Sequence, residues 1–172
     1  MSQLSILVVP DSRLKRHAEP VARVDDEVRR LMDGMLEAMH EAKGIGLAAP
    51  QVGVLKRVIV CDISRPEEEA QPYRMANPEI LWRSEDEVSG EEGCLSLPEQ
   101  YGEVTRPARI KVRYLDRHNE IREMEADGLL ARCIQHETDH LEGVLFVDHV
   151  SSLKRNIILR KLAKAKKQAA AV

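Results

Sequence analysis

The stretch that decides the fold is GLLARCIQHETDHLEG, residues 128–143. It predicts a helix over about 128–142, because Asp127 suits the N-cap position and Gly143 suits the residue that ends a helix. On such a helix His136 and His140 are one turn apart, so both imidazoles leave the same face and can bind one metal ion. Glu137 lies beside them, where it can reach a water molecule on the ion without being a ligand. This stretch therefore predicts a metal-binding helix.

The flanking segments predict what surrounds this helix. A first helix is expected over 25–42, where apolar residues recur at three- and four-residue spacing and Asp25 or Asp26 can cap the start. The segment 44–53 is too rich in Gly and Pro for a regular helix, and 64–72 is a polar hairpin loop. Strands are expected at 57–63, 73–84, 86–95, 108–116 and 121–126. A last helix is expected at 151–167.

Strands and helices alternate little along the chain, which favours one class of fold. The order predicts an α+β fold in which mainly antiparallel strands wrap around the central metal-binding helix, with N- and C-terminal helices at the two ends. No repeat or linker divides the sequence, so we expect a single domain over residues 1–172. Asp127 occupies the N-cap position of the central helix.

The composition excludes several classes of protein. The chain has 172 residues, of which 43% are hydrophobic and 32% charged, and this is typical of a globular domain. Its net charge of −3 argues against a generic nucleic-acid binder. No apolar run approaches the roughly 20 residues of a membrane span, and the N-terminus does not resemble a signal peptide. We expect a cytoplasmic protein without a membrane partner, with its three cysteines as thiols or metal ligands.

A catalytic metal site needs a third protein ligand, and the segment after the helix does not supply one. The extended metalloprotease pattern HExxHxxGxxH places Phe146 where its third histidine belongs, and a phenyl ring cannot ligate. Other HExxH proteases use a later glutamate, but none follows Glu142. Asp148 and His149 lie past the helix end, in a segment that must turn away.

The three cysteines are the upstream candidates for the third ligand. Cys133 precedes His136 by three residues, but its short side chain points below the metal, and Cys61 lies inside an apolar strand. Cys94 follows Gly93 at a predicted strand end, where a glycine allows close approach of the backbone. Cys94 with two imidazoles gives a Cys/His/His site with one position left for water. A metalloprotease or a structural metal module remains the alternative, and the latter requires a fourth protein ligand.

Three separated motifs carry a family resemblance. The segments GIGLAAPQVG (44–53), EEGCLSLP (91–98) and QHETDHLEG (135–143) resemble the three motifs of the bacterial peptide deformylases, and the likeness extends from LSILVVPDSRL to LFVDHVS. The resemblance implies a hydrolase that removes the formyl group from the N-terminal formylmethionine of newly synthesised polypeptides and releases formate. It implies one divalent ion, with Fe²⁺ expected and Zn²⁺ or Ni²⁺ as alternatives. On softness and geometry alone, a Cys/His/His set fits zinc at least as well.

The resemblance also assigns chemical roles to residues. It implies that Cys94, His136 and His140 hold the ion, and that metal-bound water attacks the formyl carbon while Glu137 acts as general base and then acid. The amide of Gln51 and the backbone N–H of Leu95 are expected to stabilise the developing oxyanion.

The substrate pocket is predicted from two segments: the face of the 128–142 helix that carries His136, and the first motif at 44–53. We expect it to be lined by Ile45, Gly46, Leu129, Arg132 and Cys133. Gly46 permits close approach of a peptide, and the stem of Arg132 is expected to line the pocket while its guanidinium reaches water. Arg132 departs from the aliphatic residue frequent in the family, and Tyr101 stands where some relatives carry an arginine.

Three charged residues are expected to support the metal site. Glu92 is a candidate acceptor for the second ring N–H of a metal-bound histidine, with a solvated strand-end charge as the alternative. Asp139 is a candidate partner of Arg106.

The last segment, about 151–172, is strongly basic. Its positive charges are Lys154, Arg155, Arg160, Lys161, Lys164, Lys166 and Lys167. One interpretation is a docked helix with a solvated basic face, and the other is a helix that binds ribosomal RNA phosphates. The expected partners are thus nascent formylmethionyl polypeptides and, through this helix, the ribosome; we expect a monomer.

Overall fold

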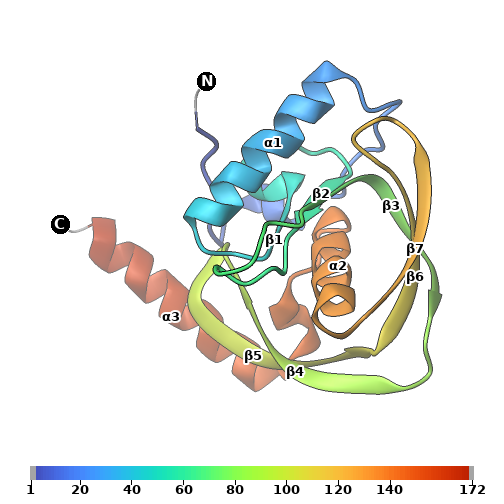
Figure 1. Ribbon diagram of the computed structural model, residues 1–172. Helices are drawn as coiled ribbons and strands as arrows, with labels where there is room; N and C mark the ends of the chain where they lie inside the picture. Colours follow the sequence, from blue (N-terminus) through green and yellow to red (C-terminus); the bar gives the residue numbers. More distant parts are fainter. Residues whose placement is uncertain (1–2, 171–172) are drawn as a thin grey trace.

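A central helix carries the two histidines of the predicted metal site. The computed structural model describes residues 3–170, and in it α2 (Gly128–Leu141) is surrounded by strands on several sides (Figure 1). Asp127 is the N-cap residue as predicted, but its side chain makes no capping hydrogen bond. Gly143 follows the helix with a left-handed φ of 74°, as the sequence predicts for a residue that ends a helix.

Within residues 3–170, seven strands form two antiparallel sheets. The larger sheet has the order β1-β2-β3-β6-β7 and the smaller consists of β4 and β5. The strand bounds are β1 (Gly46–Ala48), β2 (Val58–Cys61), β3 (Tyr73–Arg83), β4 (Glu87–Cys94), β5 (Leu97–Pro107), β6 (Arg109–Leu115) and β7 (Ile121–Asp127). The α+β class and the antiparallel arrangement of strands around α2 are therefore confirmed. The 64–72 segment joins neighbouring antiparallel strands, as the sequence predicts for a hairpin loop.

The strand β5 is absent from the sequence prediction. Its buried positions alternate with exposed ones, but those buried positions include Gly102 and Arg106 as well as Val104. A glycine and an arginine hide the apolar alternation by which a strand is recognised. The error matters for the site, because β5 carries Arg106 beside β4, the strand that ends at Cys94.

The N-terminal helix packs against the first strands. Helix α1 (Asp26–Glu41) is capped by Asp25, whose carboxylate accepts a hydrogen bond from the Val28 N–H at 3.0 Å. Its methionines are fully buried beside β1 and β2, as expected for a core stripe. This packing supports the loop that leads to Gly46.

The C-terminal helix lies on the outside of the molecule. Helix α3 (Ser152–Ala170) packs through Ile158 and Leu162, and its C-terminal part extends away from the domain (Figure 1). The basic segment predicted over 151–172 ends in two residues that are outside the described range. Within residues 3–170, no helix has the length and apolar character needed to cross a membrane.

Candidate active site

Cys94, His136 and His140 meet at one point. Their ligand atoms all lie within 4.8 Å of one another, and Cys94 Sγ is 3.4 Å from His140 Nε2. The two histidines come from successive turns of α2, while the cysteine comes from the end of β4. The sequence prediction of these three residues thus agrees with their placement, across a separation of 46 residues between Cys94 and His140.

The environments of the two histidines suit a cation. Burial lowers the pKa of His140 well below its ordinary value, helped by the positive charge of His136, which keeps a ring lone pair available. For His136, burial opposes protonation, but the carboxylate of Glu137 and hydrogen bonds with Cys94 and Glu92 raise its pKa well above the ordinary value. The surroundings of His136 therefore stabilise positive charge.

The side chains of Cys94, His136 and His140 suit one divalent ion and would leave one of its coordination positions open. A thiolate and two imidazoles are typical zinc or iron ligands, and catalytic sites have three protein ligands rather than four. Cys133 does not compete: its hydrogen bond with Cys61 and burial raise the pKa of its thiol well above the ordinary value, so this thiol stays protonated. Among the described residues, Oε1 of buried Glu137 lacks a hydrogen-bond partner, as expected for a group that faces a reaction site.

Glu137 lies against Gly46 of β1. A Cβ atom at Gly46 would collide with Glu137 Oε2 and would lie 2.7 Å from Cys133 Sγ. The absence of a side chain at Gly46 therefore makes room for Glu137, a different reason from the close approach of substrate that the sequence suggested. Burial raises the pKa of Glu137 to about 7, which suits a group that takes up and releases a proton near neutral pH.

Glu92 anchors the ring of His136. Its Oε1 is 2.9 Å from His136 Nδ1, so the other ring nitrogen, Nε2, is the one available to an ion. Burial disfavours the charge of Glu92, but hydrogen bonds from Arg106 and His136 outweigh this effect and lower its pKa. The predicted acceptor role for Glu92 agrees with this contact, and the alternative of a solvated charge is wrong because Glu92 is buried.

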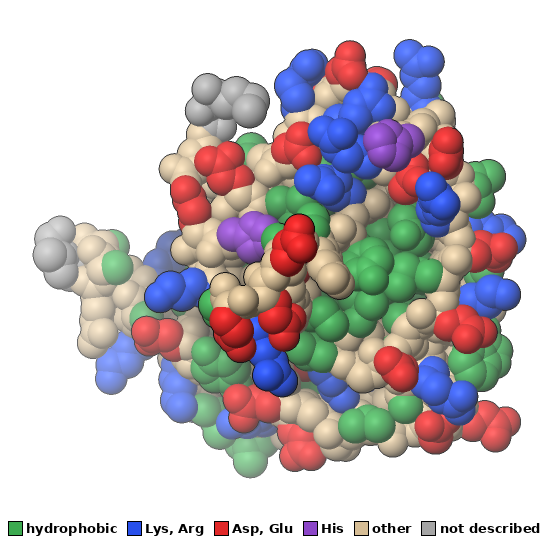
Figure 2. Space-filling view, in the orientation of Figure 1, with side chains coloured by type: hydrophobic (Ala, Val, Ile, Leu, Met, Phe, Trp, Pro, Cys, Tyr) green, Lys and Arg blue, Asp and Glu red, His purple; other side chains and the backbone are tan. Residues whose placement is uncertain are grey.

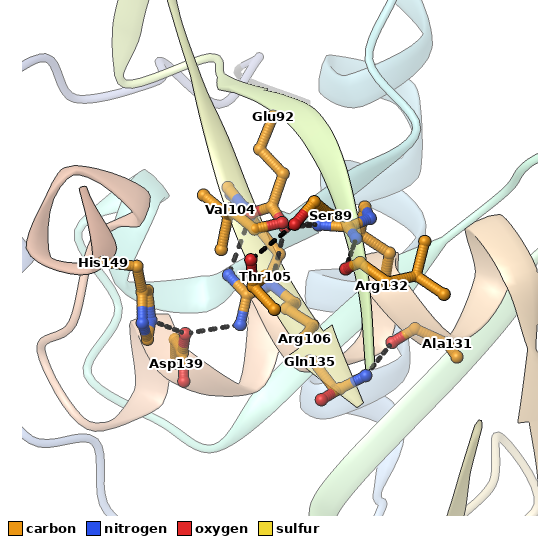
Figure 3. A network of polar contacts seen from close by, with 12 residues as sticks. Ser89, Glu92, Val104, Thr105, Arg106, Ala131, Arg132, Gln135, Asp139 and His149 are labelled. Atoms are coloured by element: carbon orange, nitrogen blue, oxygen red, sulfur yellow. Dashed lines mark hydrogen bonds and ion pairs between the residues drawn. The ribbon is translucent and has the colours of Figure 1, made fainter. Parts of the chain in front are cut away.

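Arg106 ties Glu92 to a second carboxylate. It donates to Glu92 through Nε at 2.6 Å and Nη2 at 2.9 Å, and to Asp139 through Nη1 at 3.0 Å (Figure 3). The predicted pair of Asp139 and Arg106 is therefore present. Asp139 also contacts His149 Nε2 at 2.8 Å, so His149 faces this network and not the three ligands.

The structure corrects the expectation for Arg132. Its guanidinium binds protein acceptors and is not free in water: the side chain is 14% exposed and donates to Glu92 Oε2 at 2.6 Å. It also donates to the carbonyls of Val104 at 2.9 Å and Val88 at 2.7 Å. Sequence reasoning missed these contacts because they depend on how β4 and β5 pair, and β5 was not predicted. Arg132 still lines the pocket, as expected.

Gln51 points its amide nitrogen toward the metal ligands. Its Oε1 accepts a hydrogen bond from the Ala48 N–H at 2.9 Å, and this fixes the direction of the amide. Its Nε2 lies 3.0 Å from Ser96 Oγ and 3.5 Å from Cys94 Sγ. Gln51 is buried, so the surface position typical of a loop glutamine does not apply. No pattern in the sequence indicates Ser96 as its partner.

A pocket of about 460 Å³ opens beside these groups. The residues that line it include all five predicted pocket residues, several other predicted site residues and Tyr101: Ile45, Gly46, Gln51, Cys94, Leu95, Tyr101, Leu129, Arg132, Cys133, His136 and Glu137. Ile45 and Leu129 are 40% and 50% exposed, which leaves apolar surface for a ligand to cover. Hydrophobic side chains gather on the face seen in Figure 2, around α2, and acidic side chains border them.

Comparisons with known proteins point to one family. The polypeptide deformylase family matches residues 3–156. A peptide deformylase of Phenylobacterium zucineum is 59% identical over 169 residues, which cover 98% of this chain and 100% of that protein. The crystal structure of peptide deformylase from Ehrlichia chaffeensis is 41% identical, with a TM-score of 0.93 over 98% of this chain and 99% of that one. The same enzyme in complex with actinonin is 44% identical, with a TM-score of 0.91 over 96% of this chain and 98% of that one.

Proposed function

This chain belongs to the polypeptide deformylase family and is an enzyme of that family; from this premise we propose that it removes the formyl group from the N-terminal formylmethionine of newly synthesised polypeptides. The bond that breaks is the one between the formyl carbon and the methionine nitrogen. Water supplies the oxygen, and the products are formate and a free N-terminal amine.

The observation that carries the proposal is the arrangement of Glu137 beside the three ligands in one pocket. Cys94, His136 and His140 bring a thiol and two imidazoles within 4.8 Å, and Glu137 presents a buried carboxylate next to them. A divalent ion held there, Fe²⁺ by family resemblance and Zn²⁺ or Ni²⁺ as alternatives, supplies Lewis-acid chemistry that activates water and polarises a carbonyl.

Glu137 moves the proton in this proposal. Its carboxylate accepts a proton from the attacking water, and its pKa of about 7 allows it to return that proton to the leaving amine. Gly46 keeps the carboxylate in place, because the space beside its backbone is filled by Glu137 and Cys133.

We assign two N–H groups to the stabilisation of the negative oxygen that develops during the reaction. The Gln51 amide nitrogen is held toward Cys94 by the bond between its oxygen and the Ala48 backbone. Leu95 follows Cys94 directly and lines the same pocket, so we assign its backbone N–H as the second donor. Preorganised donors of this type stabilise a developing charge without reorganisation during the reaction.

The methionine side chain of the substrate fits the apolar part of the pocket. Ile45 and Leu129 present exposed apolar surface there, while Cys133 and the stem of Arg132 form further wall. Methionine is flexible and polarizable and adapts to such a surface. The formyl group then lies at the inner end of the pocket, beside Glu137.

We also propose that the basic helix α3 docks the enzyme on the ribosome. Lysines and arginines are spread along it, and Figure 2 shows basic side chains along this helix at the lower left. RNA phosphates bind such surfaces electrostatically. Nascent chains emerge in the cytoplasm, where we expect the enzyme to act, and since all site residues belong to one chain we propose a monomer.

One assay tests the proposed reaction against the protease alternative. Freshly prepared ferrous enzyme is incubated with a formyl-Met tripeptide, and formate and peptide products are measured in parallel. The proposal expects stoichiometric formate and deformylated tripeptide with all peptide bonds intact. Cleavage of an internal peptide bond without formate would favour a metalloprotease.

A further inference from the structure

We propose that Arg132 is a positioning residue that fixes Glu92 and, through Glu92, the ring of the metal ligand His136. Arg132 lies four residues before His136, so both side chains leave the same face of α2. Both also reach the same carboxylate. Glu92 thus receives two donors from one turn of the helix that carries the site.

The two oxygens of Glu92 divide the donors between them. Oε1 contacts His136 Nδ1 and Arg106 Nη2, each at 2.9 Å. Oε2 accepts from Arg106 Nε and from Arg132 Nη1, each at 2.6 Å. Arg106 approaches from β5 and Arg132 from α2, so the two guanidinium groups hold the carboxylate from different elements. A buried carboxylate at 4% exposure cannot replace a missing donor with bulk water.

The guanidinium of Arg132 is itself held in place. It donates to the backbone carbonyls of Val88 on β4 and Val104 on β5, which ties the small sheet to α2 (Figure 3). Gly90 faces it closely, because a Cβ atom at Gly90 would lie 3.1 Å from Arg132 Cζ. A side chain fixed by three acceptors and a glycine can transmit a defined position to Glu92.

Among the arginines and carboxylates of the network, the charges are equal in number when Arg132 is included. Arg106 and Arg132 carry two positive charges, and Glu92 and Asp139 carry two negative ones. Without Arg132, the oxygen Oε2 of Glu92 keeps a single guanidinium, and Arg106 alone holds the carboxylate. The orientation of Glu92 is then less tightly fixed, and so is the acceptor that directs Nε2 of His136 to the ion.

Arg132 therefore has a role that a simple pocket wall does not have. A wall residue affects how tightly the substrate side chain is held, which changes KM. A residue that orients a metal ligand changes the affinity of the protein for the ion and the ligand field around it. These changes do not depend on the substrate. This inference rests on the proposed metal site but not on the proposed substrate.

The test compares Arg132→Met, Arg132→Lys and Leu129→Ala. Methionine retains an apolar stem but has no donor, lysine retains the charge without the planar fork, and Leu129 lines the same pocket without a contact to Glu92. Zinc affinity is measured by chelator competition, the ligand field from the visible spectrum of the cobalt form, and kcat and KM with a formyl-Met tripeptide. Circular dichroism checks folding.

We expect Arg132→Met to weaken zinc binding by about tenfold or more, a size typical of residues that support metal ligands, and to shift the cobalt spectrum. Arg132→Lys should recover part of both effects, and Leu129→Ala should change KM alone. If Arg132→Met does not fold, Arg132→Lys carries the comparison with a smaller loss of affinity.

Wild-type zinc affinity and an unchanged cobalt spectrum in the Arg132 variants, with an effect on KM only, would overturn the inference. A wild-type protein that itself fails to bind zinc, cobalt or ferrous iron would instead contradict the proposed metal site.

Discussion

The carboxylate of Glu137 and the backbone of Gly46 share a space that has no room for a side chain on residue 46. A Cβ atom there would collide with Glu137 Oε2 and would also approach Cys133 Sγ to 2.7 Å. The first motif of the sequence thus shapes the proposed base directly, because β1 lies against the turn of α2 that carries Glu137.

Replacing Gly46 with alanine should displace Glu137 while leaving the three ligands in place. We expect kcat for deformylation to fall by at least about tenfold, since correctly placed general acid–base groups contribute ~10²–10⁴ in rate. Bound metal per chain should remain unchanged. Formate release and metal content measured on the same samples check both statements.

A glycine-to-alanine change in α1 is the matched control. At Gly34 a Cβ atom would meet only the end of the Leu4 side chain, at 3.1 Å, and alanine favours a helix. Gly34→Ala should therefore keep full activity. Equal activity of Gly46→Ala and Gly34→Ala would show that the fit between Gly46 and Glu137 has no catalytic role.

The cysteines should differ sharply in their effect on metal binding. We expect Cys94→Ala to abolish tight binding of zinc, because it removes one of three protein ligands. Cys133→Ala should retain the ion, since the Cys133 thiol stays protonated and donates to the Ile45 carbonyl at 3.4 Å. Chelator competition on both variants is the measurement. Loss of zinc from Cys133→Ala with retention by Cys94→Ala would reverse the assignment.

The buried carboxylate of Glu137 should reduce the stability of the metal-free protein at high pH. Burial raises its folded-state pKa from 4.5 to about 7. Between these pH values the folded state binds the proton more tightly than the unfolded state, so the free energy of unfolding falls as the pH rises through this window. The effect is absent below about pH 4.5 and complete above about pH 7.

Glu137→Gln removes this titration. In chelator-treated protein, we expect the variant to gain on the order of 3 kcal/mol relative to wild type on going from pH 4.5 to pH 8. Urea unfolding of both proteins at the two pH values measures the difference. A stability difference that does not change with pH would mean that Glu137 ionises at its ordinary pKa in the folded state.

The proposed ribosome docking depends on the exposed face of α3. Lys161, Lys164 and Lys167 are exposed and spaced by three residues, and replacing them with glutamate leaves the buried Ile158 and Leu162 intact. We expect weaker ribosome binding and a salt dependence that is shallower by roughly one unit for each phosphate that a lysine no longer neutralises. Activity on a short formyl peptide should not change.

Charge reversal at exposed arginines elsewhere provides the control. Arg23, Arg30 and Arg83 are exposed or partly exposed and lie outside α3. Their reversal changes the net charge by the same amount, so it separates local docking from a general effect of charge. Equal loss of ribosome binding in both triple variants would contradict docking through α3.

Most elements of the fold could be predicted because their patterns are local. The sequence shows the 3.6-residue period of α1 and the alternation of apolar and polar side chains in β6. It also shows the two residues that flank α2, Asp127 at its start and Gly143 after its end. The exception is β5, where inward positions are filled by Gly102 and by Arg106. Arg106 is buried because it pairs with Glu92 and Asp139. Its pair with Asp139 could be anticipated, but a buried arginine still interrupts the apolar alternation by which a strand is recognised.

In the candidate site, too, some features could be predicted from the sequence and others depend on tertiary packing. The histidine spacing and the glycine before Cys94 make these residues candidate ligands, and the family resemblance implies the full set. Their ligand atoms lie together in the structure. The bond between Glu92 and His136 could also be anticipated, since metal-bound imidazoles need an acceptor. The contact of Arg132 with Glu92 could not, because it requires the packing of β4 and β5 against α2.

The central claim is that three ligands hold one ion while Glu137 performs the proton transfer without being a ligand. The most direct test measures metal content and formate release on the same ferrous preparations of wild type and Glu137→Gln. We predict one ion per chain in both, and formate release from a formyl-Met tripeptide slower by ~10² or more in the variant. Formate release at the wild-type rate by Glu137→Gln, or loss of the ion with the glutamate, would contradict the account.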